Sequence, residues 1–99
     1  MSEQKKPKSM PEKGKRLDFI ELTTNGVPTP KENREAWFVS TELAEQLGNI
    51  ESHVYIRNYV KEGFMGDYLF YRGAYYVPRK NLEDMKQRIR SIVHYKEKV

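Results

Sequence analysis

Apolar positions repeat at helical spacing in three stretches of this chain and alternate in a fourth. The first helical stretch is predicted over residues 41–47, with an apolar face formed by Leu43, Ala44 and Leu47. We expect Ser40 or Thr41 to cap this helix, because a hydroxyl can accept from the free N–H groups of its first turn. Glu42 would complement the helix dipole, and Gly48 would end the helix.

The second helical stretch begins after Ser52, which can cap it, and runs through about Glu62 to a closing Gly63. Its predicted inward face is formed by Ile56, Tyr59 and Val60. Its outer face is polar and partly basic, and consists of His53, Tyr55, Arg57, Asn58 and Lys61. A short helix, a turn and a second helix with such an outer face form a helix-turn-helix outline.

Apolar and aromatic residues alternate on both sides of Arg72-Gly73, which predicts a two-stranded hairpin that Pro78 ends. One face is predicted to carry Phe70 opposite Tyr75 and Tyr68 opposite Val77. The other face carries Leu69, Tyr71, Ala74 and Tyr76. We expect the first face to cover the helices as core, which leaves Tyr71 and Tyr76 for contact with a partner.

A last helix is predicted to begin near Lys80 or Asn81 and to carry a long apolar stripe. The stripe consists of Leu82, Met85, Ile89, Ile92 and Val93. Its first three residues suffice to close a small core, so Ile92 and Val93 indicate either a homodimer seam or packing against residues 17–22. We favour the packing, because that segment is apolar enough for a short strand and has no other place in the fold.

The residues ahead of these elements fall into two segments. Residues 1–16 hold two prolines, six Lys or Arg and two Asp or Glu, a composition typical of a disordered basic arm. Residues 17–35 combine an extended segment or short strand with turn residues and a polar connector that can hold one helical turn. The globular domain is therefore predicted over residues 36–95, followed by a tail at 96–99.

Charge is divided unevenly along the chain, whose net charge is +4. Residues 17–49 hold two basic and six acidic side chains, whereas residues 50–99 hold ten basic and six acidic ones. The basic half contains the second helix and the hairpin. This asymmetry favours an acidic partner, with nucleic acid as the first choice.

Catalysis and metal binding have little support in the sequence. The chain has no cysteine, and His53 has only His94 as a histidine companion, so we expect no metal site. No carboxylate pair, nucleophile with a base or phosphate-binding glycine loop occurs at meaningful spacing, so neither an enzyme nor a cofactor site is expected. No apolar run approaches the roughly 20 residues that span a bilayer, and the N-terminus lacks an apolar signal region. We therefore expect a cytoplasmic protein without membrane contact.

Three motifs, in this order, resemble those of the MerR-like and excisionase-like winged helix-turn-helix DNA-binding domains. They are FVSTELAEQLG at 38–48, YVKEG at 59–63 and RGAYYVPRKNL at 72–82. The resemblance spans residues 37–89, although residues 17–35 have no counterpart and the interval between Gly48 and Gly63 is slightly longer than usual. It implies a mainly α fold with a small β-hairpin, namely a helix-turn-helix, a two-stranded wing and a C-terminal helix.

The resemblance also implies that the second helix enters a major groove while the wing lies against the DNA backbone or a neighbouring minor groove. Arg57 can then contact a guanine and Asn58 an adenine, and Tyr55 can touch a thymine methyl group. Phosphates can be held by basic side chains, by tyrosine hydroxyls and by the amides at the start of the first helix. The complete predicted DNA-binding set is Thr41, Ser52, His53, Tyr55, Arg57, Asn58, Lys61, Tyr71, Arg72, Tyr76, Arg79 and Lys80.

Two hypotheses follow from the sequence. The leading one is a sequence-specific double-stranded DNA-binding protein, either a small transcriptional regulator or an excisionase-like recombination accessory factor of a mobile element, with RNA binding as a variant. It would act by occupying or bending DNA. The alternative is a winged-helix protein-interaction module that uses the tyrosine-rich hairpin, since tyrosine is enriched where proteins bind one another.

Overall fold

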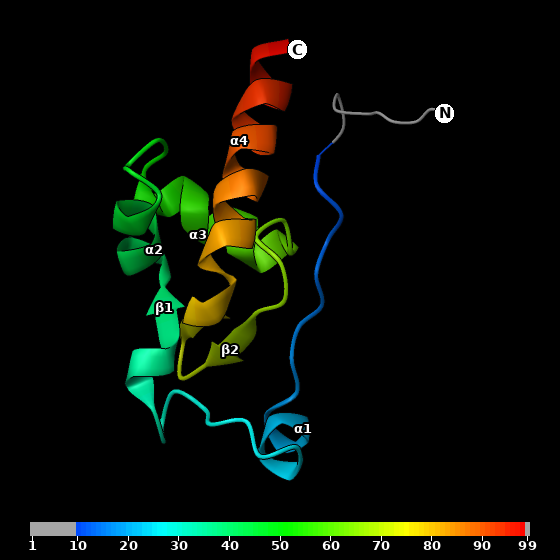
Figure 1. The fold of residues 1–99 in the computed structure, drawn as a ribbon, viewed down its shortest axis with the longest axis vertical. Helices are drawn as coiled ribbons and strands as arrows, with labels where there is room; N and C mark the ends of the chain where they lie inside the picture. Colours follow the sequence, from blue (N-terminus) through cyan, green and yellow to red (C-terminus); the bar gives the residue numbers. More distant parts are fainter. Residues whose placement is uncertain (1–9, 99) are drawn as a thin grey trace.

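A computed structural model of the chain describes residues 10–98 (Figure 1). These residues form a mixed α/β fold with four α-helices, two short 3₁₀ turns and a three-stranded antiparallel sheet. In chain order the elements are α1 (Phe19–Thr24), η1 (Arg34–Ala36), β1 (Trp37–Val39), α2 (Ser40–Gln46), α3 (His53–Glu62), β2 (Leu69–Tyr71), β3 (Ala74–Pro78), η2 (Arg79–Asn81) and α4 (Leu82–Lys98).

The predicted helix pair is confirmed by α2 and α3. Ile56 of α3 is fully buried, and Val60 is almost so, because they lie one helical turn apart on the face that meets α2 and the sheet. Gly63 ends α3 in the left-handed conformation, with φ of 88°. The predicted cap of the first helix was wrong: the Val39 N–H donates to the Glu42 carboxylate at 3.0 Å, so Glu42 caps α2 instead of Ser40 or Thr41.

The sheet has the order β1-β3-β2, so the predicted two-stranded hairpin is the outer part of a larger unit. The predicted turn and register are confirmed, since Phe70 pairs with Tyr75 and both Arg72 (φ 51°) and Gly73 (φ 78°) have the positive φ of a type I′ turn. The third strand arises because residues 37–39 pair with β3. The fold is therefore more mixed than the mainly α class that we expected.

Both faces of the sheet are buried, each against a different layer. On one face, a main core joins the sheet to α2, α3 and α4, and its fully buried members include Phe38, Leu43, Ile56, Val77, Met85, Ile89 and Ile92. On the opposite face, a smaller core contains Leu22, Trp37 and Leu69, with Leu17, Val27, Ala36, Tyr71 and Tyr76 packed around it. Successive strand residues therefore alternate between two cores, which is why the strands contain few polar residues.

The segment predicted as a strand at residues 17–22 is instead helix α1. Its cap is Asp18, whose carboxylate accepts from the Ile20 N–H at 2.8 Å. This helix covers the sheet face that carries Tyr71, with the Phe19 and Tyr71 rings stacked 5.3 Å apart. The expected packing of Ile92 and Val93 against this segment was also wrong, because both belong to the main core.

Residues 10–17 form an extended segment that we call the N-terminal strap, and in Figure 1 it runs down one side of the molecule to α1. The prediction of a disordered arm was therefore wrong for residues 10–16, and for residues 1–9 it lies outside the described residues. The predicted tail was wrong as well, because α4 continues through Lys98.

Candidate nucleic-acid interface

The outer face of α3 presents every side chain that was predicted to lie there. Burial of Ile56 and Val60 turns the opposite side of the helix outward, so its predicted polar residues are all exposed: His53, Tyr55, Arg57, Asn58 and Lys61. The sequence analysis missed Val54, which is 56% exposed. Its position four residues before Asn58 and seven before Lys61 was a sufficient signal, since such spacing places all three on one stripe.

A row of two aromatic rings between two cations continues this surface across the sheet. The Arg57 guanidinium carbon lies 5.1 Å from the Tyr75 ring centroid, and the Tyr75 and Phe70 rings are 4.7 Å apart. The Arg16 guanidinium carbon lies 5.3 Å from the Phe70 ring at the far end. We call these four residues the cation–aromatic row. It leads from α3, over β3 and β2, to the N-terminal strap.

The two guanidinium groups of this row are available to a ligand. Among residues 10–98, no carboxylate pairs with Arg16 or Arg57, and neither side chain donates to another protein group. Stacking on a ring restrains a guanidinium while leaving its N–H edge free, which favours binding of a planar or tetrahedral anion. The row is therefore a preoriented basic surface.

Arg16 has its place because backbone hydrogen bonds hold the strap. The Gly14 N–H donates to the Gly63 carbonyl at 2.8 Å, and the Lys15 N–H donates to the Asp67 carboxylate at 3.0 Å. A short parallel bridge to Tyr68 follows, with the Tyr68 N–H donating to the Lys15 carbonyl at 3.1 Å and the Leu17 N–H to the Tyr68 carbonyl at 2.6 Å. Sequence composition gave no signal for Arg16 as a site residue, because such bonds use main-chain groups that every residue has.

The C-terminal end of α4 holds the start of α3. The Lys96 ammonium donates to the Tyr59 hydroxyl at 2.9 Å and to the Glu51 carboxylate at 3.1 Å, and it lies 4.9 Å from the Tyr55 ring centroid. The hydrogen bonds to Tyr59 and Glu51 raise the pKa of Lys96. This cluster fixes Tyr55, whereas Ser52 is exposed and makes no side-chain cap hydrogen bond to α3.

Three of the predicted site residues make contacts within the fold, away from the cation–aromatic row. Tyr71 and Tyr76 lie on the sheet face towards α1, where Tyr71 stacks on Phe19 and the Arg34 guanidinium lies 5.3 Å from the Tyr76 ring. The Arg79 guanidinium lies 4.2 Å from the Phe38 ring and donates to the Glu35 carbonyl. Both tyrosines and Arg79 are thus used within the fold.

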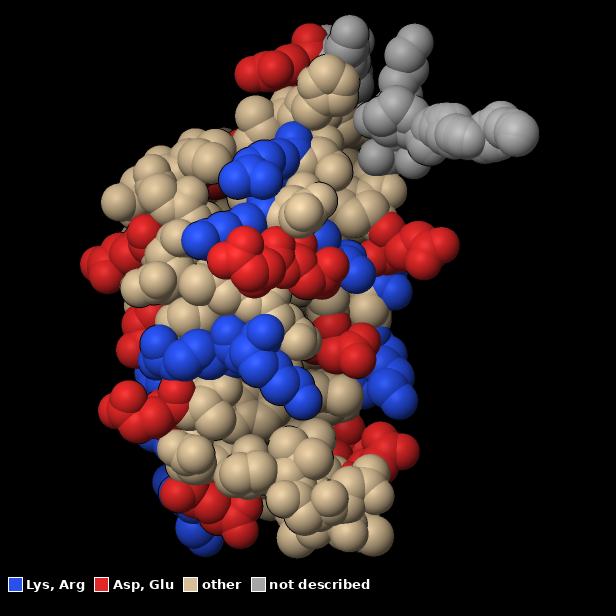
Figure 2. Space-filling model, viewed as in Figure 1, with Lys and Arg blue, Asp and Glu red and all other residues tan. Residues whose placement is uncertain are grey.

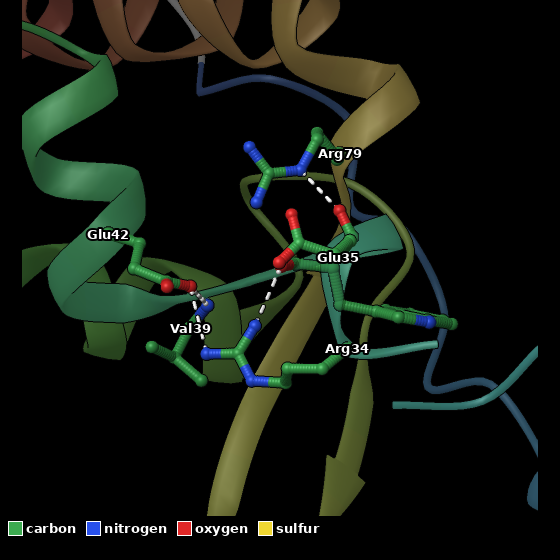
Figure 3. A network of polar contacts seen from close by, with 6 residues as sticks. Arg34, Glu35, Val39, Glu42 and Arg79 are labelled. Atoms are coloured by element: carbon green, nitrogen blue, oxygen red, sulfur yellow. Dashed lines mark hydrogen bonds and ion pairs between the residues drawn. The ribbon is translucent and has the colours of Figure 1, made fainter. Parts of the chain in front are cut away.

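Thr41 is exposed, but its surroundings are unfavourable for a phosphate. Figure 3 shows the Glu42 carboxylate between the Val39 N–H and the Arg34 guanidinium, the latter at 3.0 Å. Burial raises the pKa of Glu42, but the Val39 N–H and Arg34 outweigh it and hold the pKa below its usual value. A carboxylate that is ionised at neutral pH therefore already occupies the N-terminus of α2.

The last two predicted residues lie apart from one another. Arg72 is exposed at the hairpin turn, with its guanidinium carbon 5.6 Å from the Tyr71 ring, and it extends the basic surface at the hairpin tip. Lys80 is exposed on η2 and lines a pocket on the α1 side of the sheet.

The described residues contain neither a metal-binding cluster nor a membrane-spanning helix. Across residues 10–98, no group of three or more His, Cys, Asp or Glu side chains is arranged to hold a metal ion. In the same part of the chain, no helix has the length and apolar character needed to cross a membrane. Comparisons with protein-family models, with curated proteins and with solved structures found no match to this chain.

Proposed function

We propose that this protein is a winged helix-turn-helix protein that binds double-stranded DNA at specific sequences. In this proposal α2 and α3 are the helix-turn-helix and the β2–β3 hairpin is the wing. The protein acts by occupying or bending its site, as a small transcriptional regulator or an excisionase-like recombination accessory factor. The proposal rests on the junction of the exposed face of α3 with the cation–aromatic row.

The outer stripe of α3 supplies groups suited to base edges in a major groove. A guanidinium at Arg57 can donate two hydrogen bonds to guanine, and the amide of Asn58 can pair with adenine in the same bidentate way. Exposed Val54 supplies an apolar surface for a thymine methyl group. Lys61, one turn further on, is a phosphate contact.

The remaining basic side chains are positioned for the DNA backbone. Arg16 at the end of the cation–aromatic row and Arg72 at the hairpin tip are separated by β2, so they can hold phosphates on both sides of the wing. Such contacts carry affinity and orientation, while the α3 contacts carry sequence preference. Arg16 thereby takes the role that the sequence analysis had given to Arg79.

The alternative of a protein-interaction module is weakened by the position of the hairpin tyrosines. It required Tyr71 and Tyr76 to form an exposed hot spot, but α1 and Arg34 lie over their face. On the opposite face Arg57 and Arg16 lie over Tyr75 and Phe70, and such a basic surface suits a polyanion better than an apolar protein contact.

The test is a site selection from random duplexes, followed by fluorescence anisotropy titrations of the selected site and a scrambled duplex across a salt series. We expect Arg57→Ala to cost about 1–3 kcal/mol on the selected site and to relax the preference at one base position. Lys61→Ala should weaken both duplexes equally and lower the salt slope by about one unit. The matched control is Lys31→Ala, an equal charge change in the connector between α1 and η1.

Failure of the proposal has a clear signature. If the wild-type protein binds the selected and scrambled duplexes equally at physiological salt, sequence-specific binding is refuted. If Lys31→Ala weakens binding as much as Lys61→Ala, the affinity comes from net charge and α3 is not the contact surface.

A further inference from the structure

A pocket of about 530 Å³ lies on the side of the sheet opposite the main core. Most of its wall is apolar and comes from the strap, α1, the loop that follows α1, η1 and β1: Leu17, Leu22, Val27, Pro28, Ala36 and Trp37. Its volume is within the range of about 300–1,000 Å³ that is usual for small-molecule sites. The pocket takes no part in the proposed DNA contact.

Polar groups join the lining where η2 begins, and their charges are unequal. Arg79 and Lys80 contribute two cations, and Asp67 contributes one carboxylate. Two of these three are already engaged, since Arg79 donates to the Glu35 carbonyl and Asp67 accepts from the Lys15 N–H. The ammonium of Lys80 is exposed, and within residues 10–98 no carboxylate pairs with it.

On the face drawn in Figure 2, a band of basic side chains crosses the molecule at the level of β1 and the start of α4, and the end near α1 carries acidic side chains beside uncharged ones. An apolar hollow beside a cation selects molecules that are apolar at one end and negative at the other. A neutral molecule would leave the Lys80 ammonium without a partner, and a cation would be repelled by it.

We propose that this pocket binds a small amphiphilic anion, an aliphatic or aryl carboxylate whose apolar body packs against Trp37 and whose carboxylate meets Lys80. The inference stands on the pocket alone and does not depend on DNA binding.

Trp37 is the only tryptophan of the chain, so its indole N–H gives a single, unambiguous NMR signal in the pocket wall. The experiment titrates the full-length protein with three probes of equal chain length, namely octanoate, octanamide and octylammonium. We expect saturable shifts of the Trp37 signal with octanoate, weaker binding of octanamide, and the weakest binding of octylammonium.

Two variants of opposite sign test the charge. Lys80→Ala should weaken octanoate binding roughly fivefold, the effect of one exposed ion pair, and leave octanamide unchanged. Asp67→Asn should strengthen octanoate binding about two- to fivefold, because it removes the carboxylate while the amide oxygen still accepts from the Lys15 N–H. Arg90→Ala, an equal charge change at an exposed position of α4 outside the pocket lining, is the matched control and should leave octanoate binding unchanged.

Two further variants test the location. Ala36→Phe fills the pocket and should abolish binding of octanoate and octanamide alike, with Val27→Phe as a second filling variant should the first fail to fold. Circular dichroism confirms the fold of each. The proposal is overturned if octanoate causes no saturable shift, if octylammonium binds as well as octanoate, or if octanoate still binds to a folded pocket-filling variant.

Discussion

Replacement of Gly14 by alanine tests whether the N-terminal strap places Arg16 in the proposed DNA interface. The added methyl group would lie 2.1 Å from the Gly66 carbonyl carbon and 2.3 Å from the Asp67 nitrogen. Both are backbone atoms, which cannot rotate away as the end of a side chain can. Gly14 is not among the glycines with positive φ, so alanine suits its backbone conformation and the effect of the substitution is steric.

The size of the effect follows from the contacts that the methyl group displaces. Ordinary van der Waals contact is 3.4–4 Å, so the strap must move by more than 1 Å. Such a movement takes the Gly14–Gly63 and Lys15–Asp67 hydrogen bonds, at 2.8 and 3.0 Å, beyond bonding distance. Each such bond contributes about 0.5–1.5 kcal/mol, so we expect the free energy of unfolding to fall by about 1–3 kcal/mol.

The expected loss of DNA affinity follows from the loss of one phosphate contact. One phosphate contact contributes about 0.9 to the slope of log K against log salt, which amounts to roughly fivefold in affinity at 0.15 M salt. Gly14→Ala should therefore weaken binding as much as Arg16→Ala does, although it changes no charge, and the double variant should be no worse than either.

The assays are a urea titration, anisotropy across a salt series, and hydrogen exchange of the Gly14 and Lys15 amides. Gly26→Asn is the matched control, because that glycine has nothing within 4 Å of an added Cβ and asparagine tolerates its positive φ. If exchange shows a released strap while affinity and salt slope stay at wild-type values, Arg16 makes no contact with DNA and the reasoning fails.

Two further predictions concern the core and the α2 cap. Ile92→Ala should lower the free energy of unfolding by about 2–5 kcal/mol in a urea titration, because Ile92 is fully buried, whereas Ile20→Ala, at a position 74% exposed, should change it by less than about 0.5 kcal/mol. The sedimentation coefficient should be unchanged by Ile92→Ala, and a shift to a smaller species would contradict the burial of this residue within one chain. Glu42→Gln should lower the free energy of unfolding by about 0.5 kcal/mol at neutral pH. The pKa of Glu42 in the folded protein is below its ordinary value of 4.5, so the charge stabilises the fold fully at pH values above 4.5. The difference from wild type should vanish as the pH falls through the folded-state pKa. Glu45→Gln on the same helix is the control, and a difference that persists at low pH would contradict the role of the Glu42 charge.

The helices and the hairpin were predictable because their signals are local. Periodic apolar residues and the glycines at 48, 63 and 73 determine where α2, α3 and the hairpin turn begin and end. The pairing of β1 with β3 was not predictable, since it joins residues about forty positions apart in the sequence through only three residues. Helix α1 was mistaken for a strand because six residues are too few to show a period, although Asp18 was a usable cap signal.

The candidate site, like the fold, was predictable from the sequence only in part. The exposed face of α3 follows from helical periodicity, so the exposure of its polar residues was predicted correctly. How each face of the hairpin is used depends on where α1 and the strap pack, and nothing within the hairpin sequence indicates this. The prediction chose Tyr71 and Tyr76 for contact, and these lie on the face towards α1. It missed that Arg57 and Arg16 lie over Tyr75 and Phe70 on the opposite face.

Arg16 and Leu17 make the strap a physical link between the two proposed sites. Side chains of successive residues in an extended chain point to opposite sides. Here Arg16 lies over Phe70 on the face of the cation–aromatic row, while Leu17 packs in the smaller core and lines the pocket. Release of the strap would move both side chains together, because the backbone that carries them is held by the hydrogen bond from the Leu17 N–H to the Tyr68 carbonyl. A ligand that packs against Leu17 in the docked strap therefore stabilises the position of Arg16, and by thermodynamic reciprocity a polyanion held by Arg16 stabilises the pocket.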